Sequence, residues 1–203
     1  HVYELGMPGE VLLSAGLPEL PIEMAASRLS DKSMQENHPF DLREVMDLPQ
    51  AIQRPLAVFR SATRIGSYVV MTEIEHNGKN FVVAIEANRK QGRIEVNSVR
   101  SVYPKTNSQV ANWVEEGLLE YADKKRMAEW FSKQRSNSAD VRKLFSHAAK
   151  IVEEFENPSV FVERNREGEE NIPEPQAGDQ DVKAVYRTEV LRMAKDLHVP
   201  VEF

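Results

Sequence analysis

The sequence predicts an α+β fold: N-terminal helices, then a four-stranded antiparallel sheet, then C-terminal helices. Three observations support this class. Short segments broken by prolines fill residues 1–55, β-branched runs joined by turn residues fill 56–104, and a helical spacing of apolar residues follows Thr106. Helices that are segregated from strands joined by tight turns are typical of α+β domains with antiparallel pairing.

Short helices are expected before the sheet. The first covers residues 9–14, behind a proline that suits a first helical turn, and the second covers about 24–35. Asn37-His38-Pro39 ends the second, because the residue before a proline is pushed out of the α region. Asp41 and Glu44 have the spacing of a capping box and predict that a third helix begins there.

Four strands are expected in the middle of the chain, over residues 56–59, 68–75, 81–85 and 94–103. Asn77-Gly78 separates the second strand from the third and is the strongest short-range signal for a hairpin. The turns between these strands are short, so neighbouring strands should pair antiparallel.

Helical spacing returns after Thr106 and includes an amphipathic helix over about residues 138–155. Residues 164–180 lack periodicity and are rich in Glu, Pro and Gly, which indicates a flexible segment. We therefore expect one domain over residues 1–158, an acidic flexible linker over 159–181 and, over 182–203, a C-terminal helix or the start of another module.

Composition excludes several classes of protein. The 203 residues include no cysteine, which rules out disulfides, thiolate metal sites and cysteine nucleophiles. No apolar run reaches the length of a membrane span, and the first residues lack the pattern of a signal peptide. We expect a cytoplasmic protein without a membrane partner. The chain begins at His1 instead of Met, which suggests a piece of a longer polypeptide.

The charge of the chain is unevenly distributed. A net charge of −6 argues against a nucleic-acid-binding body as a whole. Residues 54–64 nevertheless contain three arginines and no acid, and residues 86–105 contain five basic residues against two acids. A basic patch of this kind can guide a polyanion to one face of an acidic protein.

His38 is the first candidate for chemistry, because it lies in a predicted turn where a side chain can face a cleft. A neutral imidazole can accept the proton of a ribose 2′-hydroxyl, and an imidazolium can protonate the leaving oxygen. The alternative is that His38 only caps the preceding helix or packs on Phe40. His76 lies in the predicted hairpin turn and is interpreted as a surface residue.

Two strand ends supply further candidates. Arg60, followed by Ser61, ends the first strand and could bind a phosphate, although an ordinary surface arginine is equally consistent with its position. In the last strand a period of two places Asn97, Ser101 and Tyr103 on one face. Ser98 and Arg100 fall on the other face, and a bulge near Asn97-Ser98 would let the polar side chains converge. The alternative is an edge strand with a solvated outer face.

Cofactor and metal motifs are missing from the sequence. It contains no G-x-G-x-x-G, no G-K-[ST] and no H-E-x-x-H. We therefore expect no cofactor and no metal site.

Several segments resemble phage-associated MuF C-terminal domains, members of the barnase–EndoU–colicin E5/D–RelE-like nuclease group. They include LSDKSMQENHPFDLREVMDLPQAIQRPLAVFRS and IEVNSVRSVYPK, and the resemblance covers about Val2 to Pro158. It implies helices before a four-stranded antiparallel sheet, and metal-independent RNA cleavage by a toxin. It also implies an early basic site residue at His38, with Lys32 nearby, and a late pair at Ser101 and Tyr103.

The resulting hypothesis is a toxin-type, metal-independent endoribonuclease module of a phage or mobile-element protein. Its catalytic residues are His38, Arg60, Ser101 and Tyr103, and its substrate-binding residues are Lys32, Ser61, Asn97, Arg100 and Lys105. RNA is the expected substrate, and an immunity protein or the parent polyprotein is an expected partner. Phage delivery is a further possibility. The alternative is a non-catalytic protein-binding module that retains the nuclease fold.

Overall fold

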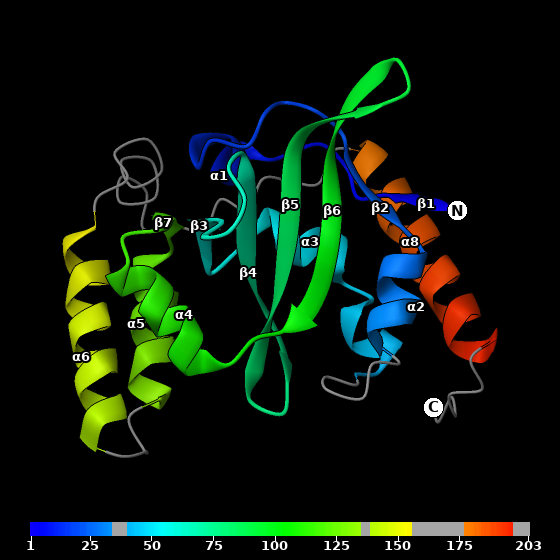
Figure 1. The fold of residues 1–203 in the computed structure, drawn as a ribbon. Coiled ribbons are helices and arrows are strands. Elements are labelled where there is room, and N and C mark those ends of the chain that lie inside the picture. The colour runs from blue at the N-terminus through cyan, green and yellow to red at the C-terminus, as the bar shows by residue number, and fades with distance from the viewer. Residues whose placement is uncertain (34–39, 135–138, 156–176, 197–203) are drawn as a thin grey trace.

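The computed structural model describes residues 1–33, 40–134, 139–155 and 177–196 (Figure 1). Within these residues seven strands form one mixed sheet in the order β1-β2-β6-β5-β4-β3-β7. The strands are β1 Val2–Glu4, β2 Ile22–Ala25, β3 Ala57–Arg60, β4 Ser67–His76, β5 Lys79–Gln91, β6 Ile94–Pro104 and β7 Leu119–Ala122. The helices are α1 Glu10–Ser14, α2 Ser27–Ser33, the 3₁₀ helix η1 Leu42–Val45, α3 Leu48–Gln53, α4 Asn107–Glu115, α5 Lys124–Lys133, α6 Ala139–Glu154 and α8 Ala177–Asp196.

The predicted four-stranded antiparallel sheet with helices only before and after it is wrong. The four expected strands are β3 to β6, which pair antiparallel in the middle of a larger sheet. β2 adds to β6 in parallel, β1 adds to β2, and β7 adds to β3. Helices are interspersed, since α1 lies between β1 and β2, and α4 lies between β6 and β7.

The three strands that the sequence did not reveal are short. β1 has three residues, and β2 and β7 have four each. Segments of this length carry too little alternation to be distinguished from helix by periodicity. Residues 22–25 and 119–122 overlap or adjoin segments in which the apolar spacing also fits a helix. Pairing with a distant strand therefore decided their conformation.

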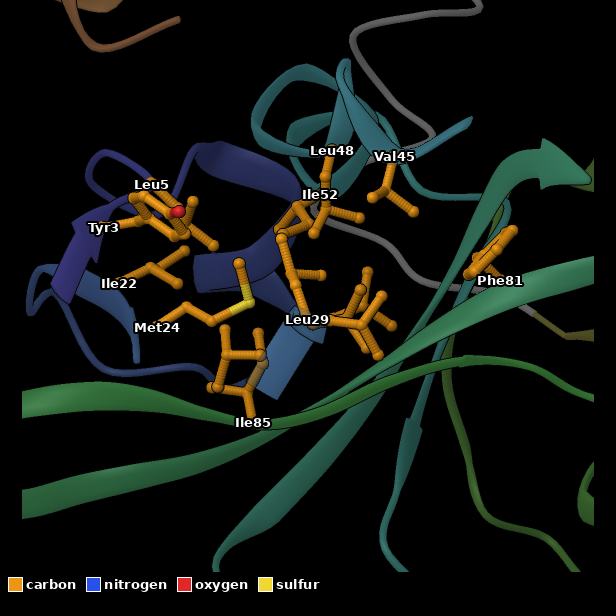
Figure 2. Close-up of a cluster of buried hydrophobic side chains, with 14 of the residues drawn as sticks. Tyr3, Leu5, Ile22, Met24, Leu29, Val45, Leu48, Ile52, Phe81 and Ile85 are labelled. Carbon is orange, nitrogen blue, oxygen red and sulfur yellow. The ribbon is translucent and has the colours of Figure 1, made fainter. Parts of the chain in front are cut away.

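One face of the sheet packs on the N-terminal elements and α8 (Figure 2). This first cluster contains buried side chains of α1, α2, η1 and α3 as well as sheet residues such as Phe81 and Ile85. Six residues of η1, α3 and the central strands show how the early helices meet the sheet. All six belong to the first cluster: Leu42, Val45, Ile52, Val58, Val83 and Ile85.

The opposite face packs on α4, α5 and α6, which gather on one side of the sheet in Figure 1. In this second cluster Trp130 lies edge-on to Phe131 and Phe145, with ring centroids 5.0 Å and 5.7 Å apart. Trp130 Nε1 also donates a hydrogen bond of 2.8 Å to Oδ1 of Asn80, which is buried in β5. Asn80 in turn donates to the Thr72 carbonyl, 3.0 Å away, where the pairing of β4 with β5 is irregular.

Helix α8 contacts the first cluster. Its Tyr186, Val190 and Ala194 are buried there, and Tyr186 Oη donates a hydrogen bond of 2.9 Å to the Val45 carbonyl. The helix expected from residue 182 is thus part of α8, whereas residues 156–176 lie outside the described residues. The predicted division into domain, linker and terminal segment stays a prediction. Among the described helices, none combines the length and the apolar character that crossing a membrane requires.

Replacing Tyr186 with Ala should lower the free energy of unfolding by about 4 kcal/mol, because a buried ring and its hydrogen bond are both lost. Val185, on the same helix, is 63% exposed, so Val185→Ala should change it by less than about 0.5 kcal/mol. Urea denaturation measures both values. Equal, small effects of the two substitutions would show that α8 does not stabilise the sheet.

Candidate functional site

A bulge at Arg100 organises β6. Ala84 pairs with Ser101 and Ile85 pairs with Val99, so Arg100 is an extra residue on β6. Val99 and Val102 are three residues apart yet both lie in the first cluster, which only a bulge permits. The predicted bulge near Asn97-Ser98 therefore lies a few residues further along the strand.

Ser101 and Tyr103 lie on the face of the second cluster. Ser101 is opposite Ala84, and Tyr103 is opposite Val82 of the second cluster. Both side chains are partly exposed. The structure thus keeps these two predicted site residues together on one face, with Arg100 beside them.

A lysine and two aromatic rings extend this group. Lys105 Nζ is 5.4 Å from the centroid of the Tyr103 ring and 5.2 Å from that of the Trp113 ring on α4. Burial raises the pKa of the Tyr103 hydroxyl from its usual value. Partial burial lowers the pKa of Lys105 from its usual value. We call Arg100, Ser101, Tyr103, Lys105 and Trp113 the β6 face.

The chemistry of the β6 face suits a phosphodiester strand. Hydroxyl groups of serine and tyrosine can donate hydrogen bonds to phosphate oxygens. Arginine and lysine offset the negative charge that increases in a phosphorane-like transition state. The faces of partly exposed aromatic rings give bases a surface on which to stack.

Arg60 is not part of the β6 face. Its Nη2 donates to the Gly117 carbonyl at 2.9 Å, and its Nε forms an ion pair with Glu120 of β7. β3 is three strands away from β6, about 14 Å. Phe59 faces the second cluster, so the alternation of the strand directs Arg60 to the opposite face. The structure therefore does not bring Arg60 together with Ser101. Ser61 lies in the loop after β3, where its Oγ is 3.4 Å from Thr63 Oγ1.

Asn97, expected to bind substrate, is fully buried. Its Nδ2 donates hydrogen bonds of 2.8 Å to the carbonyl groups of both Pro18 and Leu20. Its backbone N–H donates to the Pro21 carbonyl, also at 2.8 Å. Asn97 therefore links the turn before β2 to β6, and its expected substrate contact stays a prediction.

His38 lies outside the described residues, and Lys32 is part of α2. Phe40, two residues after His38, packs on Phe81 in the first cluster, with ring centroids 4.9 Å apart. That contact is on the face of the sheet opposite to Ser101. The role of His38 stays a prediction.

His76 is a candidate that the sequence interpretation set aside as a surface residue. Its side chain is 22% exposed, and Nδ1 lies 2.9 Å from Oε2 of Glu44. Nε2 lies 3.0 Å from Nδ2 of Asn77. Glu44 also completes the predicted capping box with Asp41. A carboxylate on one ring nitrogen fixes the tautomer of an imidazole, as proton-transfer sites require. In the sequence, only Glu44 pointed to this contact with His76. Its spacing from Asp41 was already explained by the capping box.

The described ranges contain no cluster of side chains suited to a metal ion. No set of three or more histidine, aspartate or glutamate side chains there is placed to hold a metal ion.

Comparison with known families gives one match. Residues 29–129 match the family model of the phage MuF C-terminal domain. This segment includes the central strands β3 to β6, with the entire β6 face, whereas β1, α1, β2, α6 and α8 lie outside it. The match is to the MuF domain and does not extend to the wider nuclease group. Searches of curated proteins and of solved structures found no match.

Replacing Asn97 with Ala should lower the free energy of unfolding by about 2 to 3 kcal/mol. The reason is that the carbonyl groups of Pro18 and Leu20 lose the buried side-chain donor that they share. Ser98 is the neighbouring, partly exposed residue, and Ser98→Ala should have a much smaller effect. Thermal and urea unfolding measure both. A stable Asn97→Ala variant with weakened RNA binding would instead support the role that the sequence suggested.

Proposed function

We propose that this chain is a metal-independent endoribonuclease module of a phage protein, and that its β6 face binds the RNA strand. The observation that carries the proposal is the convergence of Ser101, Tyr103 and Lys105 on one partly exposed face. The phage MuF C-terminal domain match covers all of these residues and supports an origin in a phage protein.

The reaction that fits these groups is transesterification. A base removes the proton of the ribose 2′-hydroxyl, and the 2′-oxygen forms a bond to phosphorus while the bond to the 5′-oxygen breaks. An acid protonates the departing 5′-oxygen, which leaves a 2′,3′-cyclic phosphate and a 5′-hydroxyl. Tyr103, whose pKa is raised by burial, donates to a phosphate oxygen, and Lys105 offsets the charge.

His38 is the proposed base, because its predicted turn would let it face a cleft and because the resemblance implies an early basic site residue at this position. His76 is the second candidate because Glu44 holds its ring, although its neighbours Glu44 and Phe81 lie on the face of the first cluster. Arg60, which was expected to bind a phosphate, is not used in this proposal because its guanidinium group contacts the Gly117 carbonyl and Glu120. An immunity protein that blocks the β6 face, and a cytoplasmic RNA target, belong to the same proposal.

The competing function is a protein-binding module that uses the same face without catalysis. The net charge of −6 favours it, because many ribonucleases that act as toxins are basic. Overexpression in a bacterial host distinguishes the two functions, since only the nuclease should be toxic.

Purified protein should cleave single-stranded RNA in EDTA, leave 2′,3′-cyclic phosphate ends and spare DNA, which lacks the 2′-hydroxyl. His38→Ala should lower the rate at least about 100-fold, the contribution of a general acid or base. His147→Ala is the matched control, because His147 is an exposed residue of α6 with a side chain 68% exposed. It should leave cleavage and toxicity unchanged.

Cleavage of DNA and RNA alike, or inhibition by EDTA that magnesium reverses, would contradict the mechanism. Absence of both cleavage and toxicity in the unaltered protein would favour the binding module. Equal activity of the His38→Ala variant, with loss of activity in His76→Ala, would move proton transfer to the Glu44–His76 pair.

A further inference from the structure

Three arginines meet at one carboxylate beside the β6 face. Glu86 Oε2 lies 3.3 Å from Arg64 Nη1, 3.3 Å from Arg89 Nη1 and 3.4 Å from Arg100 Nε. The arginines come from the loop after β3, from β5 and from β6. Three positive charges and one negative charge leave this arginine cluster with a net charge of +2.

The backbone brings the arginines together through irregular pairing. The bulge in β6 contributes Arg100, and a second irregularity between Glu86 and Arg89 adds a residue to β5, where Asn88 adopts a φ of 52°. The Arg64 loop is fastened at both ends, since Ser61 N–H donates to the Ser67 carbonyl and Ala87 N–H donates to the Gly66 carbonyl. Bulges of this kind redirect side chains and are common beside functional sites.

A buried hydroxyl faces the same place. Ser67 pairs directly with Glu86 across β4 and β5, so the two side chains share a face. Ser67 is 9% exposed, and its Oγ has no hydrogen-bond partner among the described residues. A buried hydroxyl without a partner is uncommon, and this one can donate a hydrogen bond to a bound group.

The guanidinium groups retain donors for such a group. Each has five N–H donors, and the contacts with Glu86 use few of them. The side chains of the three arginines are between 30% and 57% exposed, so a ligand can reach them. In Figure 1 the β5–β6 hairpin extends past its neighbours at this end of the sheet.

We propose that Arg64, Arg89 and Arg100 bind one phosphate of the RNA backbone, close to the phosphate that Ser101 would contact. Ser67 Oγ donates a hydrogen bond to the phosphate that the arginines hold. Glu86 holds the three guanidinium groups in place before RNA binds. The site rests on the proposed function for the identity of its ligand. It makes Arg100 the link between the arginine cluster and the β6 face.

A binding titration tests the site independently of catalysis. The probe is a fluorescent 2′-O-methyl RNA oligonucleotide, which lacks the nucleophilic hydroxyl and is not cleaved. Arg64→Gln, Arg89→Gln and Arg100→Gln should each weaken binding about tenfold, because each removes a charged hydrogen bond to phosphate. Each should also reduce the slope of log affinity against log salt by about 0.7, the value for one contact on a single strand.

Arg93→Gln is the matched control, since Arg93 is exposed in the same hairpin and has no ion-pair partner among the described residues. It should leave both the affinity and the slope close to those of the unaltered protein. Equal losses in Arg93→Gln would show a diffuse basic surface and would overturn the site. A lowered melting temperature of the cluster variants, together with unchanged RNA binding, would also overturn the site. The arginines would then only stabilise the sheet.

The outcomes separate the two proposals. Tight, salt-dependent binding that the cluster variants lose, without cleavage of unmodified RNA, supports the phosphate site and contradicts the nuclease. RNA cleavage that the cluster variants leave unchanged, together with unchanged binding, supports the nuclease and contradicts the site.

Discussion

The bulge at Arg100 is the constraint on which the candidate site depends. A regular strand would send Val99 and Val102 to opposite faces, and one of them would leave the first cluster. With the bulge, both valines stay in that cluster while Ser101 and Tyr103 face the other side. Arg100 is this extra residue, and its guanidinium group lies beside the Glu86 carboxylate. The hydrophobic core and the polar face are therefore fixed by a single irregularity in β6.

The other edge of β6 carries β2 and then β1, two strands that lie outside the family match. Asn97 binds the turn before β2 through two side-chain donors, and β2 then pairs in parallel with β6. On the same side of the sheet, Tyr186 of α8 donates a hydrogen bond to the Val45 carbonyl. Its ring also packs on Tyr3, with ring centroids 5.6 Å apart. These segments complete the first cluster and leave the second face to α4, α5 and α6. The candidate site thus lies on the face of the second cluster, and α8 packs on the other face.

Local signals predicted the centre of the sheet well and its edges poorly. Asn77-Gly78 and the β-branched runs revealed β4 and β5, and the capping box at Asp41 is present. β2 and β7 were not predicted, because a strand of four residues is too short to show a clear period of two. Their partner strands are also distant in the sequence. Composition alone could not distinguish Asn97, an internal donor, from Ser101, a partly exposed one. Nor could it show that Arg60 forms an ion pair with Glu120 on the opposite face.

The most direct test of the account is an NMR titration of side-chain N–H signals with the uncleavable oligonucleotide. The Nε–H signals of Arg64, Arg89 and Arg100 and the indole signal of Trp113 should shift together as RNA binds. Arg60 Nε–H, beyond the sheet, and the Trp130 indole, which donates to Asn80, should stay in place. Shifts at Arg60 with none at the arginine cluster or Trp113 would contradict the assignment of the β6 face.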